Sequence, residues 1–172
     1  MFKRNKVVFV STVIVVLTVV IDLITKNIIN TTMRPYETIN VIPNFFNIVY
    51  AKNLGAAFSF LNGTPDWFRK PFFFIIPIIA LLLVTILLAK SKKEMLKVVA
   101  FSLVIGGALG NFINRLEYGY VIDFLDFKLA ANYHWPSFNV ADIAITVAVA
   151  ILFIDMIKIE QMKRKAKKTK KR

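Results

Sequence analysis

The stretch Gly110-Asn111-Phe112-Ile113-Asn114-Arg115, with Val121-Ile122-Asp123-Phe124 and Phe138-Asn139-Val140-Ala141-Asp142 after it, gathers acids, amides and one arginine within residues 110–142. The rest of the chain is strongly apolar: 57% of its 172 residues are hydrophobic and the mean hydropathy is +0.62. A soluble domain usually has about 45–50% apolar residues, so the composition indicates a membrane protein. Polar groups at membrane depth are costly, which makes this stretch the first candidate for a functional site.

Four apolar runs, at about residues 7–27, 71–89, 98–116 and 138–158, are long enough to cross a bilayer. They predict a membrane α-helical fold with four transmembrane helices in a single membrane-embedded domain, residues 1–172. The first run is longer than the apolar region of a signal peptide, so we expect it to stay in the mature protein. Residues 45–50 are rich in aromatic and β-branched side chains. They predict a strand in a small β-rich cradle between helices one and two.

The basic residues predict how the helices are oriented. The net charge is +13, and Lys and Arg gather before residue 7, between residues 90 and 97, and in a basic tail at about residues 159–172. We expect this tail to be disordered. Under the positive-inside rule both termini are cytoplasmic, while the cradle and residues 117–136 are extracytoplasmic. Stacking aromatic residues do not accompany the tail, so nucleic-acid binding is not expected.

The residue counts exclude several kinds of site. Cysteine is absent and His134 is the single histidine. Disulfides, a cysteine nucleophile and a multi-histidine metal site within one chain are therefore excluded. We expect neither a metal nor another cofactor.

The predicted topology brings polar residues from separate helices to one membrane boundary. Asp22 and Lys26 fall at the outer end of helix one, four positions apart, so they can pair on one helix face. Asn111 and Arg115 fall at the outer end of helix three with the same spacing. The convergence predicts a functional site at the extracytoplasmic boundary. Gly106 and Gly110, close to Asn111 in the sequence, have the spacing of close helix packing.

Two acids near this boundary suggest aspartyl hydrolysis. An ionised carboxylate removes a proton from water, and a protonated carboxyl polarises the scissile carbonyl. Asp123, in the outward loop after helix three, and Asp142, near the start of helix four, are the candidate pair. Asp126 is an alternative partner for Asp142. Asn139 and Asp142 also fit a capping arrangement, with Asn as the N-cap residue and an acid three positions later, which is compatible with catalysis.

Two other functions also use acids among helices. One is a small transporter or proton-coupled carrier, and the other is an assembly or anchoring protein in which the acids would only join helices. Carriers tend to have their sites near the bilayer midplane, whereas these acids lie near one boundary. For both alternatives, Asp123→Asn and Asp142→Asn would leave function intact, so substitution separates them from a peptidase.

Taken together, these residues closely resemble lipoprotein signal peptidase, or signal peptidase II, of bacteria. The motifs that carry the resemblance occur in order along nearly the whole chain: Asp22-x-x-Thr25-Lys26, Asn53-x-Gly55-Ala56-Ala57-Phe58, Gly106-Gly107-x-x-Gly110-Asn111-x-x-x-Arg115, Val121-x-Asp123-Phe124 and Phe138-Asn139-x-Ala141-Asp142. One departure is Asn114, which stands where the family usually has Asp before the arginine.

The resemblance implies an aspartic endopeptidase that removes the signal peptide from diacylglyceryl-modified prolipoproteins by cleaving before the lipidated cysteine. Asp123 and Asp142 would be the catalytic dyad, while Asp22 and Lys26 would form a structural polar pair. The residues that would bind substrate or support the site are Asn53, Gly55, Asn111, Arg115 and Asn139.

The resemblance also implies a location and partners. The enzyme would be a multi-pass protein of the bacterial cytoplasmic (inner) membrane, with its active site near the extracytoplasmic face. Its expected partners are the prolipoprotein substrate, the lipid bilayer and a globomycin-type cyclic peptide inhibitor. We expect a monomer.

Overall fold

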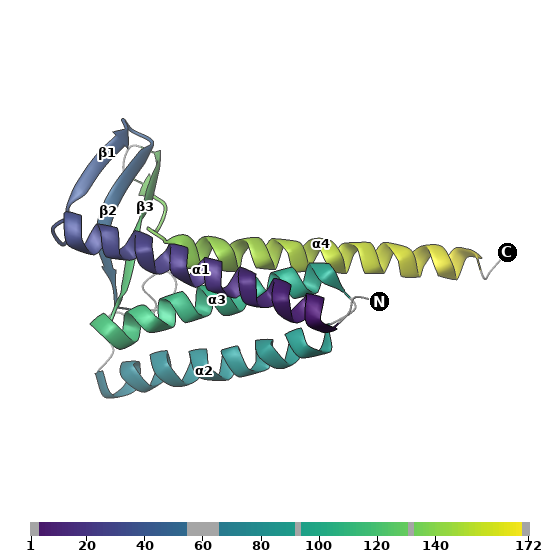
Figure 1. Cartoon of the computed structure of the whole chain (residues 1–172). Coiled ribbons are helices and arrows are strands. Elements are labelled where there is room, and N and C mark those ends of the chain that lie inside the picture. Colours follow the sequence, from purple (N-terminus) through teal and green to yellow (C-terminus); the bar gives the residue numbers. More distant parts are fainter. Residues whose placement is uncertain (1–3, 55–65, 92–93, 131–132, 170–172) are drawn as a thin grey trace.

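The computed structural model describes residues 4–54, 66–91, 94–130 and 133–169. These residues contain four helices long and apolar enough to cross a membrane, namely α1 (Arg4–Thr32), α2 (Asp66–Lys90), α3 (Met95–Tyr118) and α4 (Val140–Thr169). A small antiparallel sheet stands at one end of the bundle (Figure 1), with strands β1 (Thr38–Ile42), β2 (Phe46–Asn53), β3 (Val121–Ala130) and β4 (Tyr133–His134). The predicted fold class of four membrane-spanning helices with a small sheet is confirmed.

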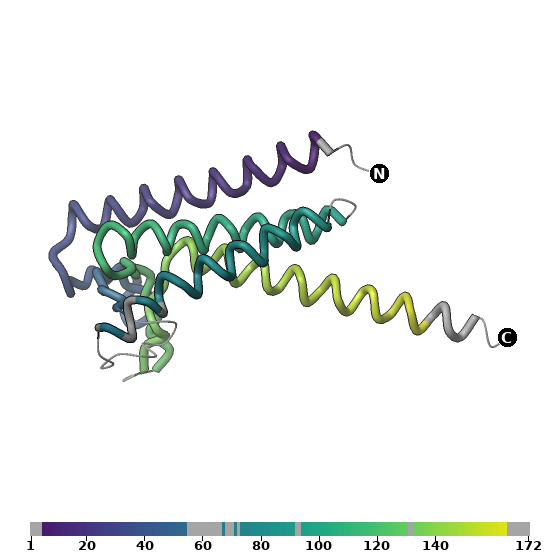
Figure 2. Tube along the Cα trace, turned by 90° about the horizontal axis from the view of Figure 1, so that it is seen from below, coloured from purple at the N-terminus to yellow at the C-terminus, as the bar shows by residue number. Residues whose placement is uncertain are grey.

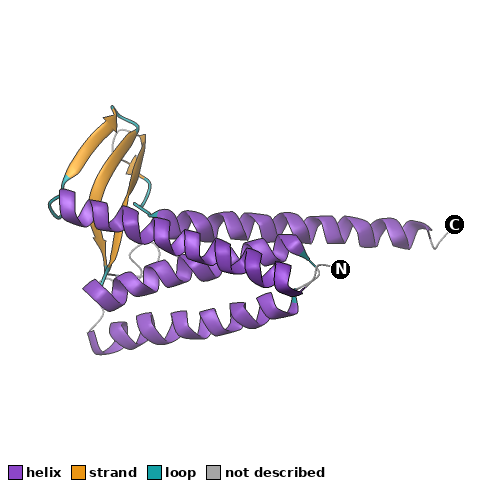
Figure 3. Cartoon of the chain, viewed as in Figure 1, coloured by secondary structure: helices purple, strands orange, loops and turns teal. Residues whose placement is uncertain are grey.

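The sheet draws its strands from two separate parts of the chain. Its order is β1-β2-β3-β4, so the strands that follow α1 pair with those that follow α3. Figure 3 shows the strands gathered at one end of the helices. Strands β1 and β2 lie between α1 and α2, as predicted for the cradle, but β3 and β4 come from between α3 and α4, so the expectation that Asp123 lies in a loop was wrong. Over residues 121–124 the strand β3 is buried on both faces. It therefore lacks the alternation by which a half-buried strand is recognised in a sequence.

Helix α3 is the centre of the bundle and packs against α1, α2 and α4. Seen from below in Figure 2, α2 and α4 diverge from each other. Small residues let the helices approach: a Cβ on Gly106 would lie 2.7 Å from Cβ of Thr18 on α1. A Cβ on Gly107 would lie 2.5 Å from the carbonyl oxygen of Ala141 on α4, and one on Gly110 would overlap the Asp22 carboxylate. The predicted close packing through Gly106 and Gly110 is confirmed.

A small apolar core joins the end of α1 to the sheet. It consists of buried side chains from α1, β2 and β3, namely Ile29, Met33, Tyr50, Ile122 and Phe124. Many large apolar side chains of α1, α2 and α4 are instead exposed, as helices in contact with lipid require. The core holds β3, which carries Asp123, against the C-terminal end of α1.

Two helices extend beyond their predicted bounds. Helix α4 continues through Thr169, so the expectation of a disordered tail was wrong for residues 159–169. Lys, Arg, Glu, Gln and Met are good helix formers, which accounts for this continuation. Helix α2 begins at Asp66, five residues before the predicted start. Gly55 and the residues 56–58 of its motif lie outside the described residues.

Candidate active site

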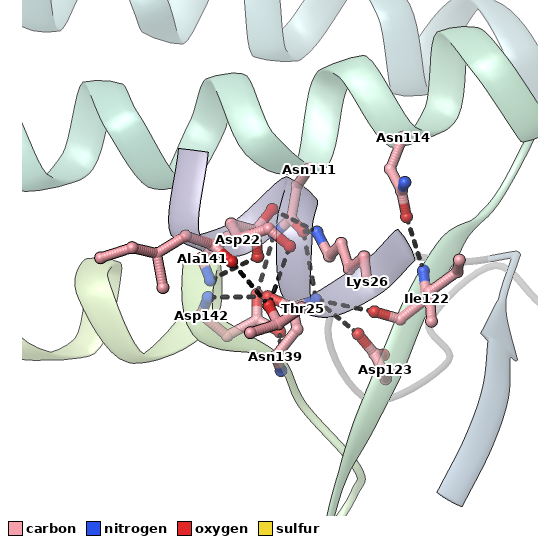
Figure 4. A network of polar contacts seen from close by, with 11 residues as sticks. Asp22, Thr25, Lys26, Asn111, Asn114, Ile122, Asp123, Asn139, Ala141 and Asp142 are labelled. Atoms are coloured by element: carbon pink, nitrogen blue, oxygen red, sulfur yellow. Dashed lines mark hydrogen bonds and ion pairs between the residues drawn. The ribbon is translucent and has the colours of Figure 1, made fainter. Parts of the chain in front are cut away.

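Asp123 and Asp142 line the same cavity, of about 680 Å³, at the sheet end of the bundle. Asp123 comes from β3, and Asp142 lies in the first turn of α4. Figure 4 shows how the polar side chains of α1, α3, β3 and the start of α4 converge there. The cavity is also lined by the predicted site residues Asn53, Asn111 and Arg115. Polar residues from four separated segments thus meet as the sequence predicts.

Asn139 bonds to both acids. Its side-chain Nδ2 donates to Oδ1 of Asp123 at 2.6 Å, and its backbone N–H donates to Oδ2 of Asp142 at 3.2 Å. Oδ1 of Asn139 in turn accepts from the backbone N–H of Asp142 at 3.0 Å. The last two bonds form a reciprocal cap at the start of α4, which confirms the predicted capping arrangement. The same residue therefore begins the helix and connects the two carboxylates.

Asp123 is buried in a polar setting, with 3% of its surface exposed. In addition to Asn139, Nδ2 of Asn53 donates to Oδ2 of Asp123 at 2.9 Å. The pKa of Asp123 is raised to about 7: burial raises it most, the negative charge of Asp142 also raises it, and the hydrogen bonds from Asn53 and Asn139 and the charge of Lys26 partly offset this rise. Desolvation disfavours the ionised form of a carboxyl group, which is the dominant effect here. Asp123 can consequently hold a proton near neutral pH.

Asp22 and Lys26 form the predicted ion pair, and the pair extends into the site. Nζ of Lys26 lies 2.7 Å from Oδ2 of Asp22 and donates to Oδ1 of Asn111 at 2.8 Å. Nδ2 of Asn111 then donates to Oδ1 of Asp142 at 2.9 Å. Oδ1 of Asp22 accepts from the backbone N–H of Ala141 at 2.9 Å. Helix α1 thereby positions the first turn of α4 through two independent routes.

Two neighbouring residues of α3 face different parts of the site. The guanidinium of Arg115 lies 5.2 Å from the ring centre of Phe73 on α2, at the cavity wall. Oδ1 of Asn114 accepts from the backbone N–H of Ile122 at 2.9 Å, which attaches β3 to α3. An aspartate at position 114 would accept the same bond through a carboxylate oxygen. Asn114, in place of the Asp that is usual in the family, therefore still accepts the hydrogen bond from Ile122.

Asp126 does not share the cavity with Asp142. It is three residues from Asp123 on β3, and side chains three positions apart in a strand point to opposite faces. Its carboxylate instead accepts from Asn47 at 2.6 Å and faces His134 Nδ1 at 2.8 Å. The geometry therefore joins Asp123, and not Asp126, to Asp142 in one cavity.

Part of the cavity wall could not be predicted from the sequence. Trp135, Pro136, Ser137 and Phe138 line the cavity between β4 and α4. Apart from Phe138, which belongs to a quoted motif, no pattern in this segment marks it as part of a site. Among the described residues, no cluster of three or more His, Cys, Asp or Glu side chains could hold a metal ion.

Comparisons with known proteins show the family to which the chain belongs. The family model described as signal peptidase (SPase) II matches residues 14–158. A lipoprotein signal peptidase of Geobacter metallireducens is 41% identical over 157 residues, covering 91% of this chain and 95% of the relative. A lipoprotein signal peptidase of Geobacter sulfurreducens is 46% identical over 145 residues, covering 84% of this chain and 89% of the relative.

A solved structure has the same fold. It is described as a bacterial membrane enzyme determined by the in meso method at 1.9 Å resolution. It superposes with a TM-score of 0.70 at 39% identity, covering 87% of this chain and 93% of that one. Since the family model spans most of the chain and the relatives match over most of their length, this chain belongs to the signal peptidase II family and is an aspartic peptidase of the lipoprotein signal peptidase type.

Proposed function

We propose that this chain removes the signal peptide from diacylglyceryl-modified prolipoproteins by cleaving before the lipidated cysteine, with Asp123 and Asp142 as the water-activating pair. The proposal rests on the position of the two acids in one cavity with one shared hydrogen-bond partner. Both carboxylates line one cavity, and both accept a hydrogen bond from Asn139. Two carboxyl groups held this way can share one proton, which is what aspartyl hydrolysis requires.

The two acids take different roles at the start of the reaction. Asp123 is the buried group that holds the proton, whereas Asp142, in the N-terminal turn of α4, is the group that accepts a proton from water. Asp142 accepts a proton from water as the water oxygen adds to the scissile carbonyl. Asp123 gives its proton to the carbonyl oxygen, which produces a neutral gem-diol. The diol then returns a proton to Asp123 as the peptide bond breaks, and Asp142 protonates the departing amine.

The cavity continues along the apolar sides of two helices. Ile76 and Pro77 of α2 line it on one side, and Ile143 and Val147 of α4 line it on the other. The apolar helix of a signal peptide fits this lining, with its cleavage point at the two acids. We place the substrate among α2, α3 and α4, and a cyclic peptide inhibitor such as globomycin would occupy the same cavity.

The proposed orientation puts both termini in the cytoplasm and the sheet outside the inner membrane. Helix α1 begins and helix α4 ends toward the end of the bundle opposite the sheet (Figure 1), and the basic segments adjoin these two helix ends and the connection from α2 to α3. Water reaches the acids from outside, at the depth where a lipid-anchored cysteine must sit. We further propose a monomer with a single domain, since the site is built from one chain.

The test is cleavage of a purified diacylglyceryl-modified precursor by the purified chain. Asp123→Asn and Asp142→Asn should each lower kcat by about a thousandfold or more, because each removes a group that acts in the chemical step. Asp155→Asn is the matched control: it makes the same change on α4, about 20 Å further along the helix. The proposal fails if a folded variant with both site substitutions still cleaves the precursor.

A further inference from the structure

Asp126 is a buried acid that the proposed reaction does not use. It is 7% exposed and lies on the face of β3 away from the cavity. Asn47 of β2, itself 5% exposed, donates to Oδ2 of Asp126 at 2.6 Å. Burying a carboxyl group costs free energy unless hydrogen bonds replace its contacts with water. The partners of Asp126 therefore stabilise it in its buried position.

The second partner of Asp126 is His134 of β4. Nδ1 of His134 lies 3.0 Å from Oδ1 and 2.8 Å from Oδ2 of the carboxylate. A histidine ring nitrogen that carries a hydrogen donates to a carboxylate oxygen, so the contact suits the form of His134 with a hydrogen on Nδ1. The side chain of His134 is half exposed, whereas that of Asp126 is buried. The bond therefore attaches a surface strand to a fixed internal acid.

Directly after His134 comes the wall segment, residues 135–138, which lines the cavity. The backbone N–H of Trp135 donates to the carbonyl oxygen of Phe127 at 2.7 Å. At the far end, the backbone N–H of Phe138 donates to the carbonyl oxygen of Leu125 at 3.0 Å. The ring of Phe138 also stacks on that of Phe127, 5.9 Å between centres. The side-chain bond to Asp126 thus secures the end of the segment that is farther from α4.

Asp123 and Asp142 are held by hydrogen bonds that do not involve the wall segment. Asn139, which follows the wall segment, is attached to Asp123, Asp142 and Asn111 by its own hydrogen bonds. Loosening the segment at His134 would change the shape of the cavity wall without removing these bonds. Affinity for substrate would then change more than the rate of the chemical step.

We propose that Asp126 and His134 are positioning residues that hold the wall segment in the shape that binds the lipid-modified peptide. This inference rests on the proposed function, because it concerns the substrate of the same site. Asp126, the second acid of β3, then contributes to substrate affinity and not to the chemical step.

The kinetic test compares His134→Ala, Asp126→Asn and the variant with both changes, using a diacylglyceryl-modified precursor peptide. We expect each single change to raise KM about tenfold with little effect on kcat, which is the signature of lost binding. The combined variant should have a KM close to that of the more affected single variant, because both changes break the same contact. Lys128→Gln is the control, since Lys128 pairs opposite His134 in the sheet. Its KM should not change.

A spectroscopic test does not depend on activity. Trp135 and Trp67 are the two tryptophans of the chain, so a Trp67→Phe background isolates Trp135 emission. In that background His134→Ala should shift the emission of Trp135, whereas Lys128→Gln should not. His134 is half exposed, so this variant keeps the test available should Asp126→Asn fail to fold.

The outcomes separate the inference from the proposed function. An unchanged KM or an unchanged Trp135 emission in His134→Ala overturns the inference. A large loss of kcat in folded Asp126→Asn also overturns it, because Asp126 would then act in the chemistry. Absence of cleavage by the unchanged enzyme would count against the proposed function, and the emission measurement would still decide whether the pair holds the wall segment.

Discussion

The side-chain amide of Asn139 donates to Asp123 at 2.6 Å while the same residue caps the helix that carries Asp142. Any movement of the start of α4 is therefore transmitted directly to the carboxyl group on β3. One amide residue therefore links the two acids directly. This relationship can be tested by separating the capping function of Asn139 from its bond to Asp123.

Asn139→Ala should lose both functions. Loss of an N-cap costs about 1 kcal/mol of stability. Loss of the bond to Asp123 should lower kcat by about a hundredfold, since small displacements of catalytic groups have effects of that size. Asn139→Ser is the matched control, because serine caps helices as well as asparagine does but is too short to replace the amide. It should restore the melting temperature and not kcat; recovery of kcat would show that the bond is dispensable.

The activity should fall as the pH rises through about 7. Asp123 has a pKa raised to about 7 by burial and by the charge of Asp142, and the proposed mechanism needs the proton that this group holds. The folded state also binds this proton more tightly than the unfolded chain, where the pKa is near 3.8. The free energy of unfolding should therefore decrease as the pH rises from about 4 to about 7. A profile of kcat and of chemical unfolding against pH measures both effects.

Asn53→Ala tests the direction of this pH dependence. The hydrogen bond from Asn53 lowers the pKa of Asp123, so its removal should raise that pKa. The alkaline limb of the kcat profile should then move to higher pH. A limb that stays in place, or moves to lower pH, would show that it reports another group.

Gly110→Ala should impair both stability and activity. Its Cβ would overlap the Asp22 carboxylate, which accepts from the first turn of α4 and pairs with Lys26. Overpacking of this kind costs about 1–3 kcal/mol. Gly106→Ala is the comparison, because its Cβ would meet Thr18, one turn away from the ion pair. We expect melting temperature to fall in both variants and kcat to fall only in Gly110→Ala; equal kcat losses would contradict this.

The proposed orientation can be tested with single cysteines, because the natural chain contains none. Asn40→Cys lies on the exposed strand β1, and Lys163→Cys lies on the exposed end of α4. A membrane-impermeant thiol reagent added to spheroplasts should label position 40 at once, and position 163 only after lysis. The reverse pattern would invert the proposed topology. The unmodified protein serves as the blank.

The helices and the convergence of polar residues could be predicted from sequence because both depend on local features. Length and apolarity mark the spans, and the positions of Lys26 and Asn111 near the ends of their spans bring them to one boundary. The cap formed by Asn139 and Asp142 is likewise local, since its partners are three residues apart. These features need no knowledge of the tertiary fold.

Sequence reasoning could not choose between Asp123 and Asp126 without the resemblance, because the choice depends on strand geometry. Once residues 121–130 are known to form β3, the three-residue spacing puts the two acids on opposite faces. The strand was missed because its buried residues include acids on both faces. The pairing of β3 with β2 is long-range in sequence, which no local pattern reveals.

The bond between Asp22 and the backbone of Ala141 joins residues 119 positions apart, on the first and the last helix. A ribosome delivers α1 early and α4 last. Until α4 is inserted, Asp123 lacks its bond from Asn139, and Asp142 is not yet in the membrane. In the proposed mechanism the site is therefore complete only after α4 has docked against α1 and β3.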